Sequence, residues 1–169
     1  MVIQDTDRLV IRELSLDDAP FILELVNEPS WLRFIGDRGV RDLDGARAYL
    51  QNGPLAMYAR HGFGLYKVEL KEDGTPMGMC GLIQRQSLPD ADIGFAFFPR
   101  FWGRGYAREA ALAVLSYGRT KLGLKRILAI VNPDNDSSIK LLERLGFQFQ
   151  RMMRMPGEAT DVRLFELQL

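Results

Sequence analysis

The sequence predicts an α/β fold in which one mixed sheet is flanked by helices. Residues 62–70 and 76–83 are strand-like runs, and the loop between them contains Asp73-Gly74, a pair that favours a tight hairpin turn. Residues 125–131 form a nearly continuous apolar run, typical of a strand that is covered on both faces. From Tyr106 onward, apolar residues recur at helical spacing. Such mixing of strands and helices indicates a sheet with helices on its faces.

Length and composition favour a single domain over residues 1–169. A chain of 169 residues can bury one core but would leave two domains marginal. The 22 basic residues balance the 22 acidic ones, so there is no global field to hold nucleic acid or an anionic membrane. We therefore expect no nucleic-acid partner and no membrane partner. The protein is expected to be a monomer or a homodimer.

Cysteine and histidine are too scarce for a disulfide or a zinc site. Cys80 and His61 are each the sole residue of their type, so no internal disulfide and no usual set of zinc ligands can form. The first residues are acidic where a secretory signal needs basic ones, and no apolar stretch reaches the ~20 residues of a membrane span. These features predict a cytoplasmic protein without a metal.

The first half of the chain is expected to begin with a strand at residues 8–14, followed by a helix within residues 15–26. Ser15 and Asp17 both suit the N-cap, and Pro20, which belongs in a first turn, favours Asp17.

Further along, we expect a loop containing Trp31, Phe34 and Gly36 and a weaker helix over residues 44–51, which Asn52-Gly53-Pro54 closes. The hairpin described above follows, and residues 91–98 give a third consecutive strand.

The second half is expected to contain a helix of about four turns from Tyr106, the strand at 125–131 and a helix ending at Gly146. Residues 147–155 and 161–169 then form a closing hairpin. The total is about seven strands and about four helices.

The turn between the third strand and the Tyr106 helix carries the clearest functional signal. Its sequence, PRFWGRGYAREAA (99–111), places two glycines among three arginines at a helix start. Unpaired N–H groups at a helix N-terminus bind phosphate oxygens, and glycines let a diphosphate approach the backbone. The alternative is a turn whose glycines serve backbone geometry only. A Rossmann fingerprint would need a third small residue where this chain has Arg108, and a Walker loop would need Gly-Lys-Ser/Thr, which is absent. Both motifs are therefore excluded.

The chain resembles the GNAT superfamily of acetyl-CoA-dependent N-acetyltransferases, and within it the branch of the RimJ and RimL ribosomal-protein acetylases. The hallmark, Arg/Gln-x-x-Gly-x-Gly/Ala, is matched by Arg100, Gly103 and Gly105. TDRLVIRELSLDDA (6–19), NPDNDSSIKLLERLGF (132–147) and DVRLFEL (161–167) support it in the family's order. The resemblance implies the GNAT fold, with a mostly antiparallel central sheet.

The resemblance also implies a coenzyme A site. It assigns the backbone of residues 101–106 to the pyrophosphate, the strand end at residues 97–99 to the pantetheine arm, and Asn135 to that arm as well. The cofactor site implied in this way comprises Phe97, Phe98, Arg100, Phe101, Trp102, Gly103, Arg104, Gly105, Tyr106, Ala107, Asn135 and Ser138. Asn135 and Ser138 are also typical of a helix cap and first turn.

Catalytic residues are assigned from the same resemblance. Ser138 matches the hydroxyl that protonates the leaving thiolate, and Asp92 matches an acid able to deprotonate the amine. Asp92 is alternatively an exposed strand-end acid. Trp31 and Phe34 occupy the acceptor side, where they line a substrate pocket or belong to a satellite core.

The expected activity is acetyl transfer from acetyl-CoA to a primary amine of a protein N-terminus, a peptide or a small molecule. Two alternatives remain open. One is an acyl-CoA sensor without turnover; the other is acetylation of an antibiotic amine, although such cationic substrates favour an acidic cleft. FQFQRMMRM (147–155) lacks the acid that RimL-like relatives carry after Gly-Phe.

Overall fold

A mixed sheet of eight strands forms the centre of the computed structural model, which describes residues 1–169. The strand order is β1-β2-β3-β4-β5-β6-β8-β7, and every pair except β5 with β6 is antiparallel. The strands are β1 (Val2–Asp5), β2 (Leu9–Arg12), β3 (Leu65–Leu70), β4 (Pro76–Ile83), β5 (Asp92–Phe97), β6 (Arg126–Val131), β7 (Gln148–Met153) and β8 (Val162–Gln168).

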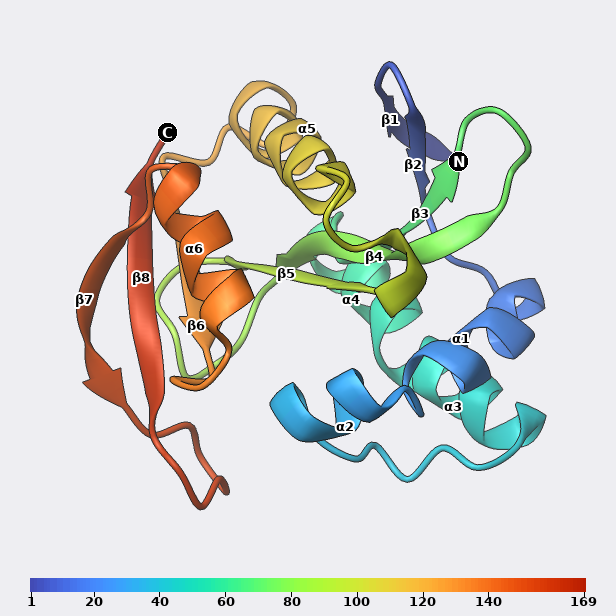
Figure 1. The fold of residues 1–169 in the computed structure, drawn as a ribbon, viewed down its shortest axis with the longest axis horizontal. Coiled ribbons are helices and arrows are strands. Elements are labelled where there is room, and N and C mark those ends of the chain that lie inside the picture. Colours follow the sequence, from blue (N-terminus) through green and yellow to red (C-terminus); the bar gives the residue numbers. More distant parts are fainter.

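Helices cover both faces of this sheet. They are η1 (Leu16–Asp18), α1 (Ala19–Leu25), α2 (Pro29–Phe34), α3 (Leu43–Asn52), α4 (Pro54–His61), η2 (Pro99–Phe101), α5 (Tyr106–Thr120) and α6 (Asp136–Arg144). The long helix α5 lies across β4 and β5, whereas α1 to α4 gather on the opposite side of these strands (Figure 1). No helix is both long and apolar enough to cross a bilayer.

The two strands β5 and β6 pair at a single position and then separate. Asp92 lies opposite Leu128, and the Leu128 N–H donates to the carbonyl of Ala91 at 2.9 Å. Beyond this point β5 continues with β4 while β6 continues with β8, so the two strands diverge (Figure 1). The sheet is therefore split into a V with Asp92 at its vertex.

The mixed α/β class and most elements agree with the sequence prediction, but the strand count was too low. Residues 2–5 form β1, an antiparallel hairpin with β2 that aligns Val2 with Arg12. These N-terminal residues show little apolar alternation, and tertiary pairing with β2 makes them a strand.

Two short helices that start at prolines were also missed, one in the expected loop around Trp31 and one after the Asn52-Gly53-Pro54 stop. Residues 31–34 belong to α2, which starts at Pro29, and Pro54 begins α4 instead of only ending α3. Proline fits the first turn of a helix, where its missing N–H would be unpaired in any case.

The N-cap prediction at Asp17 was wrong. Ser15 caps η1, since its hydroxyl accepts from the Asp17 N–H at 3.3 Å and the Asp18 carboxylate accepts from the Ser15 N–H at 2.8 Å. Pro20 does lie in the first turn of α1, but a turn of 3-10 helix precedes that helix. The extra turn moves the cap two residues upstream.

A buried ion pair fixes η1 to the sheet. Lys67 on β3 contacts Asp18 at 2.6 Å and Glu69 at 3.1 Å, and the side chains of Lys67 and Asp18 are only 8% and 7% exposed. Glu69 also pairs with Arg12 at 3.1 Å, so Asp18 is the carboxylate that depends on Lys67, because a desolvated charge is stable only when paired.

We predict that Lys67→Met lowers the free energy of unfolding by about 3 kcal/mol, because it leaves Asp18 buried without a cation. Urea denaturation measures the change. Lys71→Met is the matched control: Lys71 pairs with Asp5 on the surface, and its loss should cost less than about 1 kcal/mol. Equal effects of the two substitutions would contradict the assignment.

Candidate functional site

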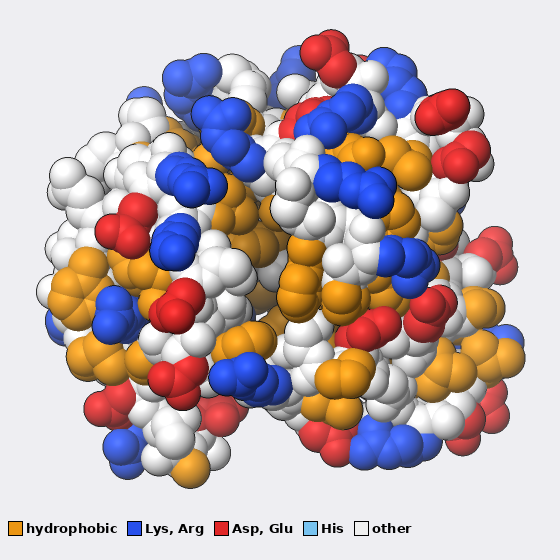
Figure 2. All heavy atoms as spheres, in the orientation of Figure 1, with side chains coloured by type: hydrophobic (Ala, Val, Ile, Leu, Met, Phe, Trp, Pro, Cys, Tyr) orange, Lys and Arg blue, Asp and Glu red, His pale blue; other side chains and the backbone are white.

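A cleft of about 1060 Å³ occupies the V between β5 and β6. It runs from the turn between η2 and α5, past the start of α6, to α2 and the β7–β8 loop. Figure 2 shows this hollow with apolar side chains in its depth and with Lys and Arg side chains on both sides of its upper part, over α6 and over η2 and the start of α5. The cleft thus has a basic entrance and an apolar interior.

The glycine turn at one end of the cleft has the backbone geometry of an anion site. Gly103 and Gly105 have φ values of 75° and 80°, which strain any residue with a β-carbon. Gly105 is the N-cap of α5, and no side chain caps this helix. The first N–H groups of a 15-residue helix are therefore left without a side-chain partner at the cleft wall.

The strand edge along β5 is also unpaired. The Phe98 N–H donates to Met77 of β4 at 3.0 Å, so the backbone groups of Phe95 and Phe97 point the other way, toward the cleft. Because the ladder to β6 stops at Asp92, no strand meets them. The carbonyl of Phe97 accepts one hydrogen bond, from the indole N–H of Trp102 at 2.9 Å.

An ion pair from the N-terminal hairpin holds the glycine turn against α5. The Arg8 side chain donates to Glu109 at 2.7 Å and to the carbonyl of Arg104 at 3.0 Å, and its guanidinium lies 4.3 Å from the ring centroid of Tyr106. Thr6 donates to the same carboxylate at 2.5 Å. Burial alone would raise the pKa of Glu109, but the hydrogen bonds from Thr6 and Arg8 outweigh it and lower the pKa.

The start of α6 lies on the other side of the V. The side chain of Asn135 accepts from the Ser138 N–H at 3.3 Å and so caps the helix. The Ser138 hydroxyl lines the cleft and makes no hydrogen bond within the protein, whereas that of Ser137 donates to Asn135 at 3.3 Å. Ser138 is therefore the hydroxyl of this turn that remains free for a ligand.

Asp92 is not an exposed strand-end acid. Its carboxylate is 1% exposed and accepts a hydrogen bond from Nε of Arg85 at 2.9 Å. Burial raises the pKa of Asp92, and the Arg85 guanidinium only partly offsets this. Both residues line the cleft near the vertex of the V.

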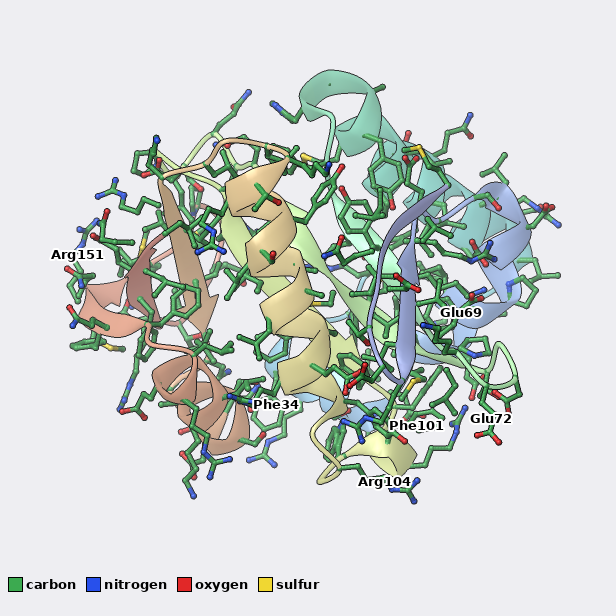
Figure 3. All side chains as sticks on the ribbon, turned by 90° about the horizontal axis from the view of Figure 1, so that it is seen from above. Phe34, Glu69, Glu72, Phe101, Arg104 and Arg151 are labelled. Atoms are coloured by element: carbon green, nitrogen blue, oxygen red, sulfur yellow. The ribbon has the colours of Figure 1, made fainter.

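Trp31 and Phe34 lie together on α2, and both line the cleft. Trp31 is buried in the main core, and its indole N–H has no partner. Phe34 is half-buried beneath the guanidinium of Arg33, 4.6 Å from its ring centroid. Seen from above, Phe34 appears between α6 and η2 (Figure 3), and α2 itself lies below both of them (Figure 1). Trp31 is therefore part of the main core and not of a satellite core, and it also lines the cleft.

Three residues of the expected cofactor site direct their side chains away from the cleft. Phe98 is buried against Phe21, and its amide is used by β4. Arg100 lies over the Phe98 ring and 3.6 Å from Glu24. Arg104 is exposed on the outer turn, away from Phe34 (Figure 3). Only the remaining residues of that set line the cleft, namely Phe97, Phe101, Trp102, Gly103, Gly105, Tyr106, Ala107, Asn135 and Ser138.

Comparison with known proteins identifies the fold and the family. The acetyltransferase (GNAT) domain family matches residues 8–148. An N-acetyltransferase of Bacillus licheniformis, p20, whose role is uncharacterized, is 32% identical over 96% of this chain and 93% of its own. The chain belongs to the GNAT acetyltransferase family.

Solved structures agree with this assignment. An acetyltransferase from Agrobacterium tumefaciens strain C58 superposes with a TM-score of 0.81, at 25% identity over 97% of this chain and 92% of its own. RimL, the ribosomal L7/L12 alpha-N-protein acetyltransferase, in complex with coenzyme A, superposes with a TM-score of 0.82 at 17% identity, covering 100% and 98% of the two chains, which shows a shared fold. This GNAT enzyme is thus an N-acetyltransferase, of a family that uses acetyl-CoA.

The sequence analysis did not identify several residues that line the cleft or hold the glycine turn, because no motif or spacing marks them. Arg85 lies in a loop, Arg144 is one of several exposed arginines, and Phe95 is a strand residue whose free backbone depends on the path of β6. Arg8 reaches the glycine turn across nearly one hundred residues of sequence. Only Phe95 could have been found, by asking which backbone groups face away from β4.

We predict that Glu109→Gln destabilises the protein by about 0.5–1 kcal/mol at pH 7, because the Arg8 side chain is partly exposed. A carboxylate whose pKa is lowered on folding contributes stability above its ordinary pKa of 4.5, and this contribution is lost as the pH falls below that value. The difference between wild type and variant should therefore shrink in denaturation curves from about pH 5 to pH 3.

Glu143→Gln is the control, since Glu143 is exposed on α6 and forms no ion pair. A Glu109→Gln difference that stays constant with pH would exclude the assigned charge interaction.

Proposed function

We propose that this protein transfers the acetyl group of acetyl-CoA to a primary amine, with residues 1–169 acting as one catalytic domain. The observation that carries the proposal is the parting of β5 from β6, which leaves the backbone of Phe95 and Phe97 without a partner strand beside an uncapped helix start. Unpaired strand groups suit an amide-containing chain, and the helix start suits a diphosphate. Acetyl-CoA has both features and supplies the thioester as the acetyl donor.

The residues that would hold the cofactor divide by chemistry. Backbone N–H groups of residues 103–106 face the pyrophosphate, whereas those of Phe101 and Trp102, which the sequence also assigned to it, donate within η2 to Phe98 and Pro99. The strand edge at Phe95 and Phe97 pairs with the pantetheine amides. Arg108 and Arg144 line the same end of the cleft and supply positive charge. The Nδ2 group of Asn135, free because the cap uses Oδ1, is available to the arm.

Ser138 and Asp92 supply the proton transfers in this proposal. The free hydroxyl of Ser138 protonates the departing thiolate, and Asp92 accepts the proton of the amine directly or through water. The demand on Asp92 depends on the acceptor: at pH 7 roughly a tenth of the α-amine at a peptide N-terminus is neutral, but only about one lysine amine in 2,500. An α-amine therefore suits a buried, paired carboxylate.

A sensor that binds acyl-CoA without turnover would need the cofactor end of the cleft only. The cleft also has an acceptor end, which is lined by α2 and by the Arg85–Asp92 pair. A site for a second substrate supports an enzyme. The test is release of coenzyme A thiol from acetyl-CoA with a panel of amines and peptides. Cofactor-dependent thermal stabilisation without thiol release for any acceptor would favour the sensor.

Aminoglycoside acetylation has little support from the charges at the acceptor end. A strongly cationic antibiotic favours an excess of carboxylates, and Arg33, Arg38 and Arg85 lie among the acids there.

We predict that Ser138→Ala lowers kcat roughly 10- to 1,000-fold, because the thiolate loses its proton donor. Its unfolding free energy should stay within about 1 kcal/mol of wild type, since the hydroxyl makes no hydrogen bond in the protein. Ser137→Ala, on the same turn, is the control and should keep its turnover. Equal kcat values for the two variants would leave Ser138 a structural residue.

We predict that Asp92→Asn reduces kcat/KM most at low pH and progressively less toward about pH 10, where the amine deprotonates without a base. Because burial raises the pKa of Asp92, the wild-type profile should fall at a higher pH than for an ordinary aspartate.

Asp90→Asn is the control, because Asp90 pairs with Arg126 and does not line the cleft. A profile for Asp92→Asn that runs parallel to wild type at every pH would show that Asp92 is not the base.

A further inference from the structure

The ion pair at the vertex of the V offers unused hydrogen-bonding groups to the cleft. Arg85, in the loop between β4 and β5, uses Nε for its bond to Oδ1 of Asp92. Its two terminal guanidinium nitrogens have no hydrogen-bond partner in the protein, and Oδ2 of Asp92 meets no other side chain. A positive and a negative group thus lie side by side, and each has atoms that can still form hydrogen bonds with a ligand.

An incoming molecule meets the arginine before the aspartate. The Arg85 side chain is 33% exposed, whereas that of Asp92 is 1% exposed, and both line the cleft. Asp92 therefore holds the guanidinium from behind and limits its rotation. A guanidinium fixed in this way binds a carboxylate through two parallel N–H groups, a geometry that lysine cannot provide.

The pair also lies where the acceptor amine must react. The glycine turn follows one end of β5, and Asp92 begins the other. A cofactor arm held at Phe97 and Phe95 therefore directs its reactive end toward Asp92. The acceptor amine must reach the thioester beside Asp92, and Arg85 is hydrogen-bonded to Asp92. An acceptor group that binds Arg85 at the same time is therefore expected on the carbon next to the amine.

The charges at the acceptor end balance. The charged residues that line it are three arginines and three carboxylates: Arg33, Arg38, Arg85, Glu28, Asp92 and Glu158. A neutral end suits a zwitterion better than a polyamine, which would find no excess of negative charge. Most other residues here are apolar, including Trp31, Phe34, Ile35, Tyr49, Met57 and Ile83.

We propose that the acceptor is a free α-amino acid with an apolar side chain, whose carboxylate binds the guanidinium of Arg85. This inference rests on the proposed acetyl transfer. The α-amine forms the new N–C bond as the thioester C–S bond breaks, and the proton lost by the amine balances the one gained by the thiolate. The apolar side chain lies against the α2 side of the cleft.

The test compares acceptors that differ only next to the amine: leucine, leucine amide and isopentylamine, with a leucine-led dipeptide and spermidine added. Wild type should show kcat/KM for leucine about 100-fold above that for isopentylamine, because a site built to bind a polar group discriminates against its absence. With each kcat/KM expressed per concentration of neutral amine, this ratio should fall to near one in Arg85→Met and to an intermediate value in Arg85→Lys. Arg47→Met, paired with Asp44 outside the cleft, is the control and should keep the wild-type ratio.

A second readout is independent of turnover. Leucine should raise the Tm of the coenzyme A-bound wild type more than isopentylamine does, and Arg85→Met should abolish the difference. If the dipeptide, the amide or spermidine outcompetes leucine in wild type, or if the ratio survives Arg85→Met, the inference is overturned while acetyl transfer stands. If no amine releases thiol, the proposed function falls and the inference with it.

Discussion

The separation of β5 from β6 is the constraint on which the site depends. A parallel pair that continued past Asp92 and Leu128 would use the backbone groups of Phe95 and Phe97 within the sheet. Because the pair ends there, the protein has a cleft lined by strand backbone in place of a closed sheet. Backbone groups are strong hydrogen-bonding groups, so an unpaired strand edge inside a cleft favours a ligand that replaces the missing strand.

The two walls of this cleft are held by different interactions. On the β5 side, Arg8 joins the N-terminal hairpin to Glu109 and to the carbonyl of Arg104, so the glycine turn is fixed from outside. On the β6 side, the Asn135 cap sets the first turn of α6 and leaves the Ser138 hydroxyl free. Each wall is thus positioned by side chains that do not need the ligand.

The vertex of the cleft combines burial with charge. Burial of the Asp92 carboxylate raises its pKa, and the neighbouring Arg85 guanidinium offsets part of that rise. The same contact restrains Arg85, which lines the cleft and whose terminal nitrogens have no hydrogen-bond partner in the protein. A proton acceptor and a carboxylate-binding group can therefore be provided by one ion pair, in accord with a substrate that carries both an amine and an acid.

Local sequence determined the element types wherever the apolar period was regular, and the glycine turn was evident because Gly103 and Gly105 stand where only glycine adopts positive φ easily. Pro54 was misread as the end of α3, although it lies in the first turn of α4, and the start of α2 at Pro29 was missed. The family motif identified the enzyme class, because its residues are contiguous in the chain.

Tertiary structure alone decided which side chains meet. Arg8 with Glu109, Lys67 with Asp18 and Arg85 with Asp92 are pairs between different elements, and nothing in local spacing specifies them. Tertiary structure also turned Phe98, Arg100 and Arg104 away from the cleft. The physical reason is that helix and strand periods depend on neighbours in sequence, whereas burial and ion pairing depend on how the sheet divides.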